Sequence, residues 1–347
     1  MTSSRFVQFH VLTSYPASLL NRDDAGFAKR MPFGGASRIR ISSQCLKRHW
    51  RTFEGAGSLS TIEGVETAVR SRLTFDELIL KPLIASGVPE GVGRSIVAGL
   101  MAAVLGDSAK AKAKAKKKSE DPVEERLQTS QLTVLGRPEV GFLLDAAKTL
   151  AAKVGAEADE KAIKAACKEF FDRDQKKNLQ TLKAGAGLDA ALFGRMVTSD
   201  ILTREDAAVH VAHAMTVHGE QSEPDYFTAV DDLLGAESDD AALGSAHLGT
   251  TELTSGLFYT YVSVDVPQLV SNLEGVKQGD WAQADLALTK AVISRLPRLL
   301  TTVSPGAKKG STAPFSYAHL LVAELGNAQP RTLAPTRIPR LARISKI

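Results

Sequence analysis

The sequence contains very little cysteine, because Cys45 and Cys167 are its only two among 347 residues. Thiols this far apart exclude the disulfide framework of small secreted domains and the paired spacing of zinc motifs. Long apolar runs are missing as well, since the most apolar stretch, Ser95–Gly106, is too short to span a bilayer. The opening residues MTSSRFVQFHVL lack the apolar centre and cleavage site of a signal peptide. We therefore expect reduced thiols, no membrane partner and a cytoplasmic location.

A large excess of charge is also absent. The net charge is only +4, so the overall charge does not select a nucleic acid, a membrane or an acidic partner. The distribution of charge along the chain becomes the informative quantity. A hydrophobic content of 44% is enough for a substantial core and for about two domain-sized units.

Three stretches alternate between apolar and other residues, which predicts strands with one buried face. They are Arg5–Leu12, Arg38–Ser42 and Leu257–Val266. The polar side chains expected to face outward are Gln8, His10, Arg38 and Arg40.

Between these stretches the sequence has helical spacing, from about Thr61 to Ala186. Within it, Ser108–Asp121 is a low-complexity segment with six lysines, which indicates either a solvated linker or a loop that meets nucleic acid. Ala208–Val217 is interpreted as a helix, and the polar stretch Gly219–Gly249 as a projecting element. A further amphipathic helix is expected within Asn272–Leu300. This layout predicts an α+β fold.

Residues Asn21–Arg51 hold eight Lys or Arg against two Asp. If Ser42 or Ser43 caps a helix, Gln44 and three cations follow on one face, while apolar residues follow on another. A helix N-terminus beside the glycines after Phe33 would suit phosphate. An ordinary surface helix with solvated cations explains the same pattern, so both interpretations remain open.

Catalytic and metal-binding patterns are weak. The loop Gly306–Thr312 (GAKKGST) lacks the spacing of a phosphate-binding P-loop. His210, His213 and His218 are spaced too broadly to aim at one metal ion. The adjacent pairs Asp23-Asp24 and Asp231-Asp232 suit caps and turns better than magnesium sites. We expect no metal, no cofactor and no catalytic residue.

Five segments carry a family resemblance. LNRDD…FGG…RIRISSQCLKR, from Leu20 to Arg48, closely resembles the backbone (CasC-type) subunit of the type I-E CRISPR Cascade complex. Four further segments resemble the same family in the same order: GRMVTS (Gly194–Ser199), DYFTAVDDL (Asp225–Leu233), GSAHLGTTELTSGLFY (Gly244–Tyr259) and PGAKKGSTAPF (Pro305–Phe315).

The resemblance implies an RRM-like (ferredoxin-like) palm, helical fingers and a β-hairpin thumb. The implied boundaries are palm 1–55, fingers 56–188 with a disordered stretch at 108–121, palm 189–218, thumb 219–254 and palm 255–347. It also implies a non-catalytic subunit that polymerises head to tail along a guide RNA (crRNA). The remaining implied partners are target DNA paired through the guide and the large, small, Cas5-like and Cas6-like subunits.

The residues that match RNA-contacting positions of the family lie in four parts of the chain. They are Arg22, Lys29, Ser42, Gln44, Lys47, Arg48, Arg51, Met196, Phe227, Thr228, Lys308 and Lys309.

The C-terminal residues depart from the family pattern. The family continues well past the segment resembling AQPRTLA, whereas here APTRIPRLARISKI follows. Two other hypotheses compete with a guide-binding subunit: a metal-dependent ribonuclease that uses the aspartates or histidines, and a protein-only scaffold whose basic helix binds an acidic partner.

Overall fold

The computed structural model describes residues 4–106, 126–155, 158–171, 173–180, 182, 185–195, 202, 204–230 and 245–334. The chain forms two compact units. A helical unit comprises Leu59–Val209 and Asp265–Val292, and a sheet unit comprises Thr2–Ser58, His210–Val264 and Ile293–Ile347. The predicted α+β class is confirmed. The lysine-rich stretch Ser108–Asp121, Met196 and the tail from residue 335 lie outside the described residues.

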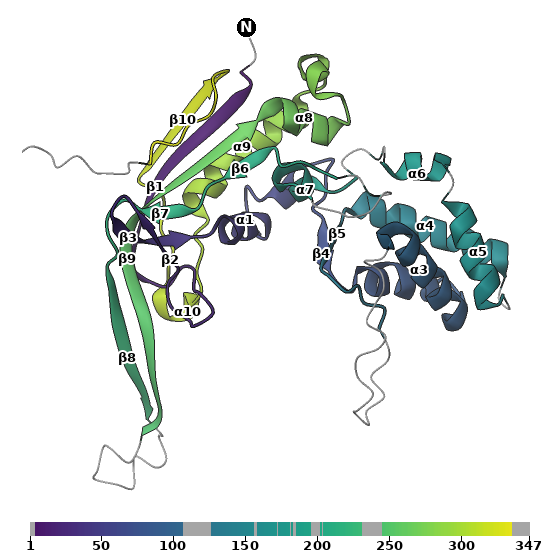
Figure 1. Ribbon diagram of the computed structural model, residues 1–347, viewed down its shortest axis with the longest axis horizontal. Coiled ribbons are helices and arrows are strands. Elements are labelled where there is room, and N and C mark those ends of the chain that lie inside the picture. Colours follow the sequence, from purple (N-terminus) through teal and green to yellow (C-terminus); the bar gives the residue numbers. More distant parts are fainter. Residues whose placement is uncertain are drawn as a thin grey trace, which may run out of the picture. The chain divides into compact units, whose positions relative to one another are not determined.

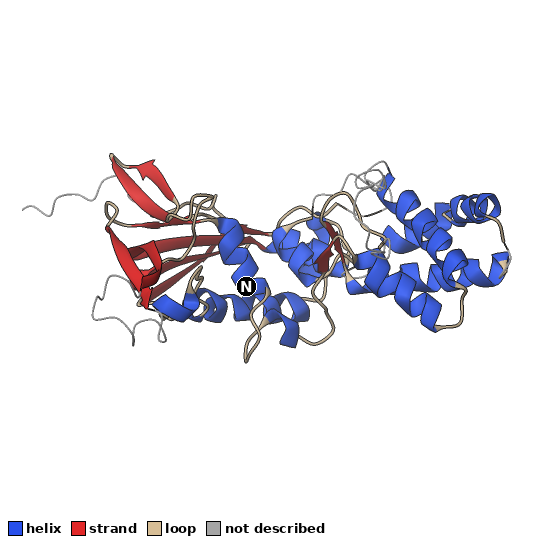
Figure 2. Ribbon diagram, turned by 90° about the horizontal axis from the view of Figure 1, so that it is seen from below, coloured by secondary structure: helices blue, strands red, loops and turns tan. Residues whose placement is uncertain are grey.

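The sheet unit is built on one antiparallel sheet, whose strands Figure 2 shows in red. Its order is β10-β1-β9-β7-β3-β2, and β6 and β8 also pair with β9. The strands are β1 (Phe6–Ser18), β2 (Arg30–Phe33), β3 (Ala36–Ile41), β6 (Val209–Val211), β7 (Ala214–Thr216), β8 (Ser222–Val230), β9 (Ser245–Asp265) and β10 (Leu320–Gly326). The helices are α1 (Ser43–Arg51), α10 (Lys309–Thr312) and α9 (Ala287–Thr302), which begins in the helical unit.

Strand β1 forms where the alternation predicts it, but both of its faces are covered. Gln8 and His10, expected to face outward, are only 5% and 4% exposed. The segment after β10 crosses this face, and the backbone N–H of Arg331 donates to Gln8 Oε1 at 3.0 Å. The expectation of a solvated face was wrong, because a segment more than three hundred residues away in sequence covers it.

The interpretation of Ala208–Val217 as a helix was also wrong. This stretch forms β6 and β7, and β7 pairs antiparallel with both β3 and β9. Its residues include several β-branched side chains at alternate positions, which favour a pleated surface between two strands. Pairing with distant strands therefore overrides the helical spacing of the alanines.

Strands β2 and β3 form a tight hairpin that pairs Phe33 with Ala36. Gly34 and Gly35 are both left-handed, with φ of 64° and 79°. A two-residue hairpin turn of this kind needs positive φ at both central positions, which glycine adopts without strain. The structure thus gives these glycines a role in the turn.

Strands β8 and β9 form a long hairpin that extends beyond the rest of the sheet (Figure 1). The pairing runs from Ser222 opposite Thr254 to Val230 opposite Ser245, with an irregularity near Val230. At its base, the Thr254 hydroxyl donates to Ser18 O at 2.7 Å, and the Ala17 N–H donates to Ser255 Oγ at 2.9 Å. The hairpin is thereby fixed to the end of β1.

Strand β10 is an edge strand, because within the described residues it pairs with β1 alone. Its large apolar side chains are unusually exposed. Leu320 is 49% exposed, Val322 39% and Leu325 70%. Since Leu325 lies opposite Val7 and Val322 lies opposite His10, apolar surface is exposed on both faces of this strand.

The helical unit has its own core, formed by side chains such as Phe75, Ile96, Leu100 and Leu143. Its helices are η1 (Leu59–Thr61), η2 (Asp76–Leu80), α2 (Lys81–Ala85), α3 (Glu90–Leu105), α4 (Arg137–Val154), α5 (Glu160–Phe170), α6 (Arg173–Gln180), α7 (Leu188–Phe193), α8 (Val266–Glu274) and η4 (Gln278–Gln283). A small antiparallel pair joins β4 (Val69–Ser71) to β5 (Thr133–Leu135). No helix of the described residues combines the length and the apolar composition needed to cross a bilayer.

Candidate nucleic-acid interface

Helix α1 begins where the sequence predicts. Ser42 is extended and its hydroxyl accepts a hydrogen bond from the Cys45 N–H at 3.3 Å, which caps the helix. Leu46 and Trp50 are buried and hold one face of the helix against the unit. The opposite face carries the predicted polar set: Gln44 and Arg48 are exposed, and Lys47 and Arg51 are partly exposed.

A short loop carrying Arg22 and Lys29 is fixed beside the start of α1. Asn21 makes the connection, because its side-chain oxygen accepts from Ser42 N–H at 2.9 Å and its carbonyl accepts from Lys29 N–H at 2.8 Å. Asp23 shapes the loop by accepting from the N–H groups of Ala25 and Phe27. Asp23 thus has the turn role that the sequence favours.

Two of the eight basic residues support the fold. Arg38, expected to face outward, is 4% exposed, and its guanidinium donates to Phe33 O at 3.0 Å and Thr216 O at 2.9 Å. A guanidinium has five donors, so it can be buried where backbone carbonyls receive them. Arg30 pairs with Glu220 at 2.8 Å and also with Glu252. The expectation for Arg38 was therefore wrong, and neither cation is assigned to a ligand.

Other cations gather around α1. Burial lowers the pKa of His49, and a hydrogen bond with the Cys45 carbonyl opposes this. The charges of Lys309 and Arg48 lower that pKa further. Burial raises the pKa of Cys45, which is also on α1, and the charges of Arg48 and Lys29 oppose that rise. Charge effects of this kind fade over about 10 Å at moderate salt. Cations from three separate segments of the chain thus lie close to one helix.

The hairpin carries a second group, in which Phe227 meets Lys308. The Lys308 ammonium lies 5.8 Å from the centre of the Phe227 ring and donates to Thr251 Oγ1 at 2.7 Å. Gly249 is paired with Phe227, and a Cβ at Gly249 would lie 2.4 Å from the ring. The ring therefore rests on the hairpin backbone because residue 249 has no side chain.

The Phe227–Lys308 pair and the loop of Arg22 and Lys29 are held by neighbouring residues of β9. Glu252, next to Thr251, accepts a hydrogen bond from the backbone N–H of Ala28 at 2.6 Å, which fastens the loop of Arg22 and Lys29. Adjacent side chains of a strand point to opposite faces. The base of the hairpin thus holds Lys308 by one face and the basic loop by the other.

Two predicted residues remain apart from these groups. Thr228 is exposed on β8 opposite Leu248, so it lies next to Phe227 in sequence but on the other face of the strand. Met196 lies outside the described residues, as does most of the GRMVTS segment. The structure therefore does not test whether Met196 approaches the other predicted contacts.

Two of the three histidines considered as metal ligands have other neighbours. His218 Nδ1 lies 2.7 Å from Gly219 O, and its Nε2 accepts from the Leu257 N–H at 3.3 Å. His213 Nδ1 lies 3.2 Å from the Arg40 guanidinium. Among the described residues, no three His, Cys, Asp or Glu side chains are grouped so that they could hold a metal ion.

Sequence reasoning missed four residues that position these groups: Asn21, Gly249, Thr251 and Glu252. The first stands within the LNRDD segment and the others within GSAHLGTTELTSGLFY, so the family resemblance covers all four but does not indicate these roles. Asn at the start of a polar turn is a recognisable signal. The partners of the other three are distant in sequence, and no local pattern indicates them.

Comparison with known proteins identifies the family of the chain. A family model described as CT1975-like protein (Cas_CT1975) matches residues 7–336. The chain belongs to this family. No curated protein sequence matches the chain at a significant level.

Two solved structures show the similarity in three dimensions. A chain described as "CRISPR RNA-guided surveillance complex, pre-nicking" is 29% identical, with a TM-score of 0.63, and the match covers 91% of this chain and 77% of that one. A chain described as "CRISPR RNA-guided surveillance complex" is 25% identical, with a TM-score of 0.59, and the match covers 95% and 79%. The similarity thus extends over most of the family member described here.

Proposed function

We propose that this protein is a guide-RNA-binding subunit of a CRISPR surveillance complex, and that it is not an enzyme. The observation that carries the proposal is the gathering of cations from the 21–29 loop, α1 and the 306–313 loop around one helix. Membership of the CT1975-like family and the likeness to chains of such complexes support it.

The chemistry of these groups suits a guide of any sequence. Lysine, arginine and helix-terminal amides bind phosphate and carry no base preference. A subunit that leaves sequence recognition to base pairing needs contacts of this kind. Phe227 adds an aromatic ring beside a cation, and such rings stack on single-stranded bases. Arg22, Lys29, Gln44, Lys47, Arg48, Arg51, Lys308 and Lys309 would hold the backbone of the guide.

Ser42 has a different role in this proposal. Its hydroxyl caps α1 and is buried, so its contribution is to fix the helix N-terminus, with its free N–H groups, beside Asn21. Phe227 and Thr228 of the hairpin, together with Met196, complete the set of proposed RNA contacts.

We further assign the chain to the type I-E backbone class, with a palm, fingers and thumb. The strand order β10-β1-β9-β7, with α1 after β1 and α9 before β10, is the order of a ferredoxin-like βαββαβ fold and supports an RRM-like palm. Residues 56–188, most of which lie in the helical unit, would supply the fingers, and the β8–β9 hairpin within 219–254 the thumb. In this proposal, copies stack head to tail along the crRNA, with large, small, Cas5-like and Cas6-like subunits as partners.

The thumb has a specific task in the proposed filament. A projecting hairpin with exposed Tyr226 and Phe227 suits contact with something outside its own subunit. We assign that contact to the guide and to the neighbouring copy near Met196. The hairpin would displace one nucleotide from the stack, so that pairing with target DNA is interrupted at regular intervals.

The proposal is tested by the salt dependence of RNA binding. The triple variant Lys47→Ala, Arg48→Ala, Arg51→Ala should bind unrelated guides more weakly to the same degree. Each lost phosphate contact should flatten the log–log salt slope by about 0.7. The matched control replaces Lys148, Lys153 and Lys161 of the helical unit with alanine and should keep the slope. An unchanged slope in the first variant would contradict an RNA-binding α1.

The unmodified protein distinguishes the proposed function from the ribonuclease and from the protein-only scaffold. Incubation with labelled single-stranded RNA and magnesium should leave the RNA intact, whereas cleavage abolished by EDTA would indicate a ribonuclease. A complex purified from cells should show the absorbance ratio of a ribonucleoprotein. A ratio typical of protein alone would indicate a scaffold without RNA.

A further inference from the structure

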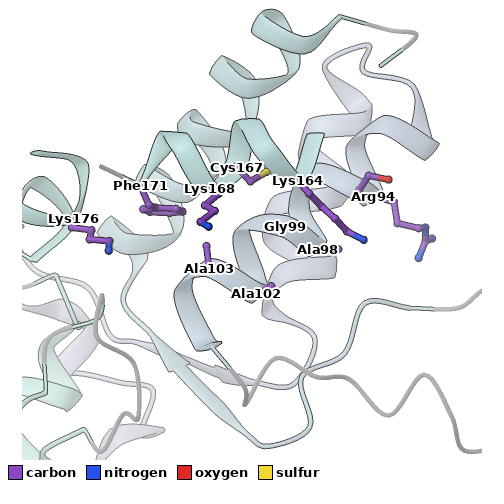
Figure 3. Close-up of a pocket in the computed structure, with 11 residues that line it drawn as sticks. Arg94, Ala98, Gly99, Ala102, Ala103, Lys164, Cys167, Lys168, Phe171 and Lys176 are labelled. Atoms are coloured by element: carbon purple, nitrogen blue, oxygen red, sulfur yellow. The ribbon is translucent and has the colours of Figure 1, made fainter. Parts of the chain in front are cut away.

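The helical unit has a groove between α3 and α5 that the proposed guide-binding function does not use. Its volume is about 570 Å³, and α6 contributes to one end (Figure 3). Figure 3 shows Arg94 and Lys176 at opposite ends of the groove, with Lys164 and Lys168 between them.

Small residues of α3 form the floor. Ala98, Gly99, Ala102 and Ala103 recur with the spacing of one helix face, so the groove runs along the helix. Gly99 allows α5 to approach closely, because a Cβ there would lie 2.7 Å from Cys167 Sγ. The floor is therefore apolar and carries only small side chains, and the backbones of α3 and α5 define its shape.

The charged side chains around the groove are basic. Of the described residues that line the groove, four are basic and none is acidic. The side chains of Lys164, Lys168 and Lys176 are exposed, and Arg94 forms an ion pair with Glu90 at 3.2 Å. The cations are distributed along the groove and do not converge on one point. That arrangement suits an extended occupant with several negative charges better than a small ligand with a single anionic group.

The residues of the floor indicate whether the occupant of the groove is a protein or a nucleic acid. Single-stranded nucleic acids bind to exposed aromatic faces as well as to cations. The aromatic residue in this groove, Phe171, is only 6% exposed and packs edge-on against Phe170, so it offers no stacking surface. The small, at least partly exposed side chains of Ala98, Ala102 and Ala103 instead allow a further helix to approach α3 closely, as in helix-in-groove recognition.

We propose that this groove binds an acidic amphipathic helix of a protein partner, with the apolar face of that helix on α3 and its carboxylates on the lysines of α5 and α6. The stretch of α3 that lines the groove, from Arg94 to Ala103, spans about 14 Å, or about two and a half turns of a partner helix. The site lies wholly within the helical unit, so it does not depend on the guide-binding residues.

The test uses the full chain and a labelled synthetic peptide of about 18 residues, long enough to be partly helical. The peptide has leucine and alanine on one face and glutamate on both flanks. Fluorescence anisotropy should show saturable binding, and a matched peptide with lysine in place of glutamate should not bind. Failure of the acidic peptide to bind would overturn the proposal.

Variants then locate the site. The double variant Lys164→Glu, Lys168→Glu should raise the Kd of the peptide at least about tenfold. Lys161→Glu, on the same helix but outside the groove lining, is the control and should change the Kd by less than about twofold. Ala102→Phe, which fills the groove at an exposed position, should weaken binding to a similar degree as the double variant. Equal effects of Lys161→Glu and the double variant would overturn the site.

A competition experiment distinguishes the alternative occupant. A single-stranded DNA carrying the same charge as the peptide should displace it poorly at moderate salt. If the DNA displaces the peptide fully and its own binding is unaffected by Ala102→Phe, the groove is a phosphate-binding surface and the proposal is wrong. Circular dichroism of each variant should match the parent, and RNA binding should be retained.

Discussion

Phe227 and Gly249 form a pair in which the residue without a side chain determines where the aromatic ring lies. A Cβ at Gly249 would lie within 2.4 Å of the ring, well inside contact distance. The ring in turn lies under Lys308, at a distance typical of a cation–π contact. The position of an aromatic ring in the proposed RNA site thus depends on a glycine on the facing strand.

Gly249→Ala should displace the Phe227 ring from Lys308 without disturbing the backbone, since the φ of Gly249 is not positive. Loss of a contact of this kind should lower RNA affinity by about two- to fivefold, measured by filter binding. Gly326→Ala, at an open position in β10, is the matched control and should bind normally. Equal affinities of the two variants would contradict a role for the ring.

Glu205 makes stability depend on pH. Burial raises its pKa from 4.5 to about 7, Arg195 opposes the rise, and Glu139 and Asp206 add to it. Between these two values the folded chain retains a proton that the unfolded chain releases, so stability falls as the pH rises through this window. The carboxyl is stabilising when protonated and costs stability when it ionises.

Glu205→Gln should remove much of this dependence. Its urea midpoint, followed by far-UV circular dichroism, should change less than that of the parent between about pH 5 and about pH 8, and should exceed it at the higher pH. Glu63→Gln, an exposed substitution in the same unit, should follow the parent. A parent midpoint that rises with pH over this window would contradict the assignment.

At the scale of elements, the sequence was informative where a pattern is local. The cap at Ser42, the two faces of α1 and the strand in the second half of β9 follow from spacing over ten residues or fewer. The interpretation failed where distant segments meet. β7 is a strand because it pairs with β3 and β9, β6 pairs with β9, and the polar face of β1 is buried by residues near Arg331.

The residues of the candidate site also differ in how far local sequence patterns predict them. The cations of α1 could be predicted from their spacing, but whether a given arginine binds a ligand or supports the fold could not. Arg38 and Arg40 are two residues apart on one strand, yet the guanidinium of Arg38 is enclosed by carbonyls from Phe33 and Thr216. Only the tertiary positions of those carbonyls distinguish the two residues.

The β8–β9 hairpin should act as a unit in assembly. The double variant Phe227→Ala, Thr228→Ala should fold normally, because both side chains are exposed, but should impair ordered binding along a guide. Nucleotide-resolution chemical probing of the parent complex should show reactive positions at a regular interval, and the variant should lose them. Uniform reactivity in the parent would rule out a displaced nucleotide.

At the scale of the whole molecule, each unit has its own core and should unfold as its own cooperative transition. Leu143 is fully buried in the helical core, and Leu143→Ala should cost about 2–5 kcal/mol there. Calorimetry should show the transition of the helical unit at a lower temperature and that of the sheet unit unchanged. Val262→Ala, buried in β9, should have the opposite effect. A single transition that shifts with both variants would contradict two independent units.

The exposed edge of β10 has a consequence for how the purified chain behaves. Unpaired strand edges with apolar side chains are templates for further strands, and proteins usually protect them with charge or with proline. β10 has neither along Leu320–Ala323, and Glu324 is its single charged residue. Concentrated solutions of the isolated chain should therefore become turbid through edge-to-edge pairing of strands while both cores are still folded, and aggregation would limit storage before thermal denaturation does.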